Sequence, residues 1–131
     1  MNVRWTATSP SSGRFAAREV QSDTAELVER FEWLRAQGRG YLEVRRDDDF
    51  PVLTMGFQNG MAVVHLFTSA ETTCLLLGEG AADAESTQVP VMDEPAEFTA
   101  EFVHRLDHAW EAIQRFVRTG EVTGLGQWQE L

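Results

Sequence analysis

The chain has 131 residues, 43% of them hydrophobic and 24% charged, a composition typical of a globular protein that folds as one domain, residues 1–131. Its 21 acidic and 11 basic side chains give a formal net charge of −10, which argues against direct nucleic acid binding and favours a basic protein as partner. No apolar run is long enough to cross a membrane, and the first residues do not form a secretion signal. Because the single cysteine, Cys74, also has no internal disulfide partner, we expect a cytoplasmic protein without membrane contact.

The first two elements are indicated by a change in hydrophobic period. Residues 3–8 alternate apolar and polar side chains, as a strand with one buried face does. From Asp23 onward the apolar residues recur at helical spacing, and Asp23 and Glu26 have the spacing of a capping box. We expect a helix over about 23–37 that ends before Gly38.

The strongest local pattern predicts a β-hairpin. Two runs rich in apolar and β-branched residues, 52–58 and 61–67, flank Asn59-Gly60, a dipeptide that favours the two-residue turn in which both residues have positive φ. This turn fixes the strand register and thereby places His65 on one face and six apolar side chains on the other. The expected apolar pairs are Leu53 with Leu66, Met55 with Val64, and Phe57 with Ala62.

Strands at 41–46 and 72–78 are expected to extend this hairpin into an antiparallel meander of about four to six strands. Residues 79–95 are rich in acidic and small side chains, which predicts an exposed loop with a short edge strand at 88–92.

The last part of the chain predicts a helix and a returning tail. Pro95 suits a first helical turn, and an apolar stripe that begins at Phe98 predicts one long C-terminal helix over about 96–119, terminated by Gly120. The fold class is then α+β, with the meander packed against this long helix and the shorter N-terminal one. Trp128, near the end of the chain, predicts a segment that docks either on its own domain or on a partner.

Two groups of residues have types that occur in enzymes. On a helix, His104 and His108 share a face with Asp107 between them, which approximates an inverted zinc-protease motif and suggests a small metal-dependent hydrolase as the least favoured function. A catalytic zinc needs a third ligand that the sequence does not specify, so a polar helix flank is the preferred interpretation. Cys74 and His65 lie on neighbouring predicted strands, but a cysteine in an apolar run is more commonly a buried hydrophobe. We therefore expect no enzyme activity, catalytic residue, metal or cofactor.

Acidic clusters are the predicted partner-binding residues. They are Asp47, Asp48 and Asp49 in a turn, and Glu79, Asp83 and Glu85 in the later loop. The first cluster lacks the ligand spacing of a calcium loop. Acids on adjacent turns of one sheet would face a basic partner together. Trp33 lies off the apolar stripe of its helix, so it is either an interface anchor or covered by the N-terminal strand.

The segment AIQRFVRTG at 112–120, followed by Trp128, resembles the C-terminal signature of the immunity proteins of bacterial polymorphic toxin systems, specifically the Imm family numbered one. The predicted meander and C-terminal helix are also similar to that family over about 40–131. The resemblance implies an α+β protein made beside a secreted or contact-delivered toxin, often a nucleic-acid deaminase. Such a protein binds its toxin and blocks it without catalysis. A secretion chaperone, also small and acidic, is the alternative, and the sequence is compatible with a monomer or a homodimer.

Overall fold

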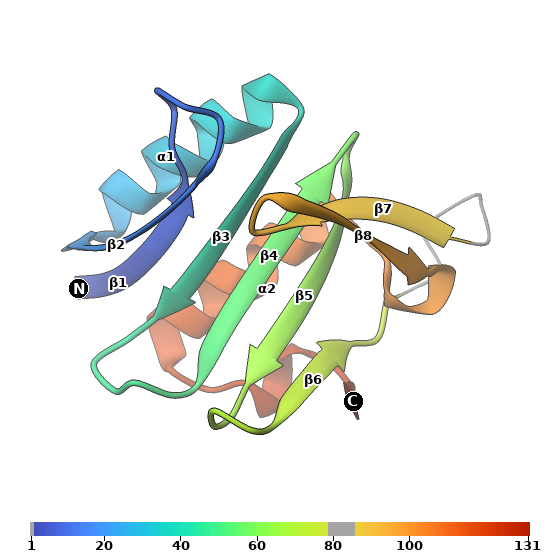
Figure 1. Ribbon diagram of the computed structural model, residues 1–131. Coiled ribbons are helices and arrows are strands. Elements are labelled where there is room, and N and C mark those ends of the chain that lie inside the picture. The colour runs from blue at the N-terminus through green and yellow to red at the C-terminus, as the bar shows by residue number, and fades with distance from the viewer. Residues whose placement is uncertain (1, 79–85) are drawn as a thin grey trace.

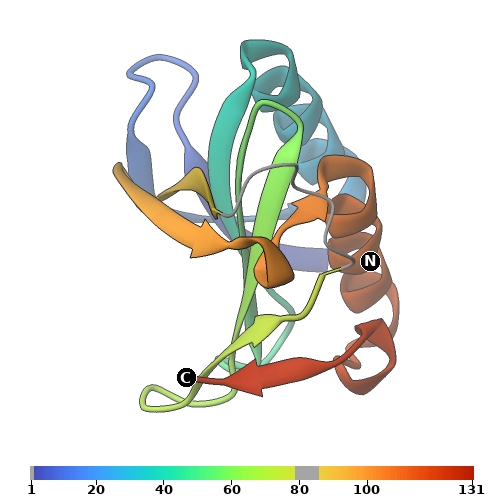
Figure 2. The same cartoon turned by 90° about the vertical axis from the view of Figure 1, so that its right-hand side faces the viewer.

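The computed structural model describes residues 2–78 and 86–131 and has three layers (Figures 1 and 2). The main sheet is formed by β1 (Asn2–Thr8), β2 (Phe15–Asp23), β3 (Arg39–Arg45), β4 (Val52–Gln58), β5 (Met61–Phe67), β6 (Thr73–Leu76), β9 (His104–Arg105) and β10 (Trp128–Glu130). Helices α1 (Thr24–Gln37) and α2 (Leu106–Thr119) cover one face, and a hairpin of β7 (Ser86–Val91) and β8 (Glu94–Thr99) crosses the other. The strand order in the described residues is β10-β6-β5-β4-β3-β1-β2, with β9 beside β5, and every pairing is antiparallel. The predicted α+β class is confirmed.

The central hairpin and the first helix agree with the sequence predictions. Asn59 and Gly60 both have positive φ, and the pairs Leu53–Leu66, Met55–Val64 and Phe57–Ala62 form as predicted. All six side chains are buried against the helices. At the start of α1 the Asp23 carboxylate accepts a hydrogen bond from the Glu26 amide at 3.1 Å, and Gly38 ends the helix. These elements form where predicted because their signals are local.

The predicted helix over 96–119 is wrong in its first part. It ends at Thr119 as expected, but α2 begins only at Leu106, so both helices have 14 residues. Residues 94–99 form β8, where Pro95 pairs with Pro90, and a 3₁₀ turn (Ala100–Phe102) follows. The apolar side chains of this stretch pack on the hairpin side of the sheet, away from the main core. The apolar residues from Phe98 onward therefore do not form one helix face. Phe98 and Phe102 pack in the cluster on the hairpin side of the sheet, whereas the residues from Leu106 onward pack in the main core.

The described residues form more strands than the four to six expected. Two of the additional strands, β2 and β8, have no fully buried side chain, so neither shows a clear apolar alternation in the sequence. The edge strand expected at 88–92 is present as β7, but it pairs with β8 in a separate two-stranded sheet.

Two apolar cores lie on the two faces of the main sheet. The larger one fills the space between the sheet and the helices, where Phe31 of α1 stacks on Trp110 of α2 with ring centroids 4.0 Å apart. The smaller one lies under the hairpin. Its buried members are Val63, Leu75, Val89 and Val103, and Met61, Phe98 and Phe102 pack against them. The hairpin is thus held to the sheet by its own apolar cluster.

The C-terminal tail docks on its own domain. Gly120 ends α2, a 3₁₀ turn (Thr123–Leu125) follows, and β10 then pairs with β6 so that Trp128 lies opposite Leu76. The Trp128 ring packs against the larger core, and its Nε1 donates to the Val122 carbonyl oxygen at 2.9 Å. The sequence predicted that Trp128 docks either on its own domain or on a partner, and the contacts described here lie within its own domain.

A Trp128→Ala variant should lower the free energy of unfolding by about 2 kcal/mol, less than the ~3–5 kcal/mol of a fully buried tryptophan because the ring is only half-buried. Chemical denaturation monitored by far-UV circular dichroism measures this difference. A Trp128→Phe variant, which keeps the ring packing but loses the indole donor, should lose less stability. Equal stability of wild type and Trp128→Ala would contradict the assigned packing.

Candidate protein-binding surface

The acidic turn, residues 46–51, connects β3 to β4 and is anchored by one arginine of β1. Arg4 donates from Nε to the Arg46 carbonyl oxygen and from Nη2 to the Asp48 carbonyl oxygen, both at 2.9 Å. Its Nη2 also lies 3.4 Å from Asp49 Oδ1. Because two of these bonds go to the backbone, the turn is held while the side chains of Asp47, Asp48 and Asp49 stay exposed. The expectation that these acids occupy a turn is confirmed.

Charges on the sheet face behind the acidic turn are paired with one another. A register shift where β1 pairs with β2 breaks the regular alternation, and Glu19 of β2 contacts arginines from two other strands. Its carboxylate accepts from Arg45 Nε at 2.7 Å and lies 3.7 Å from Arg4 Nη1. These ion pairs neutralise charges on this face, whereas the carboxylates of the acidic turn stay exposed.

A partly buried hydroxyl network lies beside these ion pairs. The Tyr41 hydroxyl donates to Glu43 Oε2 at 2.7 Å, and the Thr6 hydroxyl donates to Glu43 Oε1 at 3.2 Å. Burial and the neighbouring Glu43 carboxylate raise the pKa of Tyr41 far above its usual value, so the phenol keeps its proton and serves as donor. With both oxygens of Glu43 bonded, the network holds β1 and β3 together on this face.

An exposed aromatic ring accompanies the acids of the turn. Phe50 is 38% exposed and borders a shallow hollow of about 160 Å³ between the acidic turn and the C-terminal end of α2. An apolar ring surrounded by charged groups resembles the anchor and rim of protein interfaces. The turn therefore offers a partner both charge and apolar area.

The second predicted cluster, Glu79, Asp83 and Glu85, lies outside the described residues. The strand that precedes it, β6, is among the described residues. Since β4, β5 and β6 are successively antiparallel, the chain leaves β6 at the end of the sheet opposite the acidic turn. Gly78, the last described residue before the second cluster, therefore does not adjoin the 46–51 turn. The position of β6 gives no support to the expectation that the two acidic clusters lie on adjacent turns.

The arrangement expected for a metal site is not formed. His104 lies in β9, before α2 begins, so it does not share a helix face with His108. The buried His104 ring makes a 3.0 Å hydrogen bond with the Leu76 carbonyl oxygen, and Asp107 pairs with Arg35 at 2.9 Å. Residues 2–78 and 86–131 contain no group of three or more His, Cys, Asp or Glu side chains placed to hold a metal ion.

Cys74 and His65 lie on opposite faces of the sheet. Cys74 pairs with Leu66 of the core row and packs against the larger core, whereas His65 pairs with Leu75 on the hairpin side. The sheet therefore separates the thiol from the imidazole, and the two cannot act as a nucleophile and its base.

His65 should make the stability of the protein fall at acidic pH. Its ring lies 5.4 Å from the Phe98 ring, and burial lowers its pKa from 6.5 to about 4. The unfolded chain then binds the proton more tightly, so the free energy of unfolding should decrease as pH falls from 6.5 to about 4, by about 3 kcal/mol in total.

Denaturation of the wild type and of His65→Phe across this pH range tests the expectation. Carboxylates titrate in the lower part of the same range in both proteins, so the measured quantity is the difference between the two curves. As pH falls, the free energy of unfolding of His65→Phe should rise relative to that of the wild type. A difference independent of pH would contradict the assigned burial.

No protein-family model and no curated protein matches the chain. Among the described residues, no helix combines the length and the apolar character needed to cross a membrane.

Proposed function

We propose that this protein is an immunity protein that binds and neutralises a basic bacterial toxin through the acidic turn and performs no catalysis. The observation that carries the proposal is the turn itself, in which exposed carboxylates and Phe50 are presented on a backbone anchored by Arg4. The resemblance of residues 112–120 and Trp128 to the Imm family numbered one supports the same function. In the protein this segment forms the end of α2 and the docked tail.

The proposed mechanism is competition for a basic surface. A toxin that acts on nucleic acid must present positive charge where it binds phosphate. A protein with a net charge of −10 is attracted to such a surface, and carboxylates on a fixed turn lose little freedom when they bind. Phe50 would then exclude water at the centre of the contact. Occupation of the toxin's basic surface blocks the toxin without any chemical step.

Co-expression tests the proposal. The chain is produced together with the toxin encoded beside its gene, and survival of the host is compared with expression of the toxin alone. We expect survival and a complex that purifies as a single species by size exclusion. Loss of viability with no complex would overturn the proposal, and a tight homodimer that binds an unfolded client would favour the secretion chaperone instead.

A further inference from the structure

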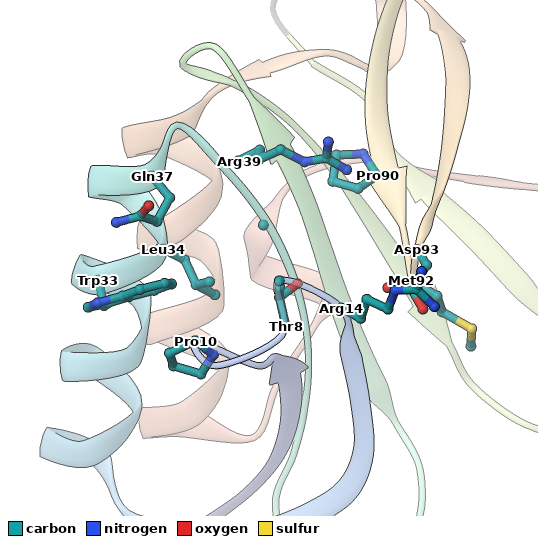
Figure 3. Close-up of a pocket in the computed structure, with 12 residues that line it drawn as sticks. Thr8, Pro10, Arg14, Trp33, Leu34, Gln37, Arg39, Pro90, Met92 and Asp93 are labelled. Atoms are coloured by element: carbon teal, nitrogen blue, oxygen red, sulfur yellow. The ribbon is translucent and has the colours of Figure 1, made fainter.

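A second hollow surface lies away from the acidic turn. It is a groove of about 640 Å³ between α1, the loop that joins β1 to β2, the start of β3 and the turn of the β7–β8 hairpin (Figure 3). Leu34 and Gly40 are buried at its base. Trp33 on α1 and Met92 on the hairpin turn lie on opposite sides. This surface, called here the arginine groove, is assembled from four separate parts of the chain.

The arginine groove is basic although the protein is acidic. It is lined by Arg14 and Arg39, and neither forms an ion pair with any of the described residues. Figure 3 shows Arg39 extended across the groove toward Pro90. Two guanidinium groups without an ion-pair partner, lining one hollow, favour an anionic ligand.

Among the described residues, Asp93 is the one acid that lines the arginine groove, and its carboxylate is already engaged by the backbone. The Asp93 carboxylate accepts a hydrogen bond from the Phe15 amide at 2.6 Å, which ties the hairpin turn to β2. Asp93 therefore serves to hold one wall of the groove in place.

The walls of the arginine groove expose large apolar side chains. Trp33 is 41% exposed and Met92 is 49% exposed, whereas Trp5 and Trp110 are buried at 2% and 8%. An exposed tryptophan beside charged groups is typical of surfaces that bind a peptide. The interface-anchor interpretation of Trp33 is thus the one that its exposure favours.

We propose that the arginine groove binds an extended segment of a partner polypeptide that carries a carboxylate next to a large apolar side chain. The guanidinium groups of Arg14 and Arg39 would bind the carboxylate, and the exposed Trp33 ring would contact the apolar side chain. A carboxylate is favoured over a phosphate because it carries one negative charge rather than about two, and Asp93 and the net charge of −10 oppose the larger charge. This chemistry is the opposite of that of the acidic turn, so the inference does not depend on the proposed toxin.

Peptide titrations of the full chain test the proposal. The probe is a six-residue peptide, blocked at both ends, that has one glutamate next to one phenylalanine among glycine and serine residues, and its matched control has glutamine in place of the glutamate. In nitrogen-15 NMR spectra we expect the glutamate peptide to shift the Trp33 indole resonance and to bind at least about tenfold more tightly than the glutamine peptide. Equal affinity of the two peptides, or no shift at millimolar peptide, would overturn the proposal.

Variants distinguish the groove from the general charge of the protein. The double variant Arg14→Gln/Arg39→Gln should weaken binding of the glutamate peptide at least about tenfold. The matched control Arg18→Gln/Arg105→Gln removes the same charge from exposed positions that do not line the groove and should leave the affinity unchanged. Equal loss in both variants would contradict a local site. Tighter binding of adenosine monophosphate than of the peptide would instead assign the groove to a phosphate ligand.

Discussion

A Gly56→Ala substitution should lower the free energy of unfolding by about 3 kcal/mol and release the β7–β8 hairpin from the sheet. Gly56 lies in β4 on the face that the hairpin covers. A Cβ atom placed there would collide with the Pro90 carbonyl oxygen and lie 3.5 Å from the Val89 side chain. Because the first obstacle is backbone, no side-chain rotation relieves it, and either the hairpin or the sheet must move.

Denaturation and limited proteolysis measure the two effects of Gly56→Ala. We expect a lower denaturation midpoint and faster cleavage within residues 86–99. Gly124→Ala is the matched control, because an added Cβ there meets its nearest atom, Arg115 Nη2, only at 3.9 Å. Wild-type stability of Gly56→Ala, with an uncleaved hairpin, would show that the close approach is not structurally required.

The same substitution links the fold to the arginine groove. Pro90, Met92 and Asp93 reach the groove only because the hairpin is docked on the sheet. Gly56→Ala should therefore weaken binding of the glutamate peptide as well. The acidic turn, held by Arg4, should keep its geometry. One substitution that removes no charge from either surface thus separates the two.

Local signals in the sequence predicted the elements that depend on local interactions. Asn59-Gly60 determines both the turn and the register of β4 and β5, so one dipeptide specifies which side chains enter the core. The first helix is likewise specified by its cap at Asp23 and its end at Gly38. No distant residue is needed to make either prediction.

The errors occur where the burial of a side chain depends on a distant partner. Phe98 and Phe102 are separated by the spacing of a helix face, yet they pack on a cluster that includes Val63 of β5 and Val89 of β7. Residues 15–23 form an edge strand whose side chains are at most half-buried, so their sequence contains little apolar alternation. Pattern alone does not show which face of a sheet will be covered, or by what.

The surfaces were predictable to different degrees. A run of three aspartates before a strand identifies an exposed turn, but nothing in the sequence indicates that Arg4, more than 40 residues earlier, anchors it. The arginine groove combines Arg14, Arg39 and Met92 from separate elements, and Trp33 was its only sequence signal. Sites assembled by tertiary packing leave few local traces.

The triple variant Asp47→Asn/Asp48→Asn/Asp49→Asn should slow association with the proposed toxin by about tenfold to a hundredfold at low ionic strength. These carboxylates are exposed, so they contribute more to electrostatic attraction at a distance than to contacts in the final complex. The dissociation rate should therefore change much less than the association rate. Surface plasmon resonance at several salt concentrations measures both rates, and the wild-type association rate should depend more steeply on salt than that of the variant.

A matched control separates the acidic turn from the overall charge. Glu26, Glu29 and Glu32 are exposed on α1, and the variant Glu26→Gln/Glu29→Gln/Glu32→Gln removes the same charge at a different surface. If the turn binds the toxin, this control should retain most of the wild-type association rate. Equal slowing of both variants would mean that the toxin senses only the net charge of −10, and the acidic turn would then not be the binding site.

An Arg4→Met variant keeps all three aspartates but removes the hydrogen bonds to the Arg46 and Asp48 carbonyl oxygens. Its association rate should lie between those of the wild type and the triple variant, because the negative charge remains while the turn that carries it is less firmly held.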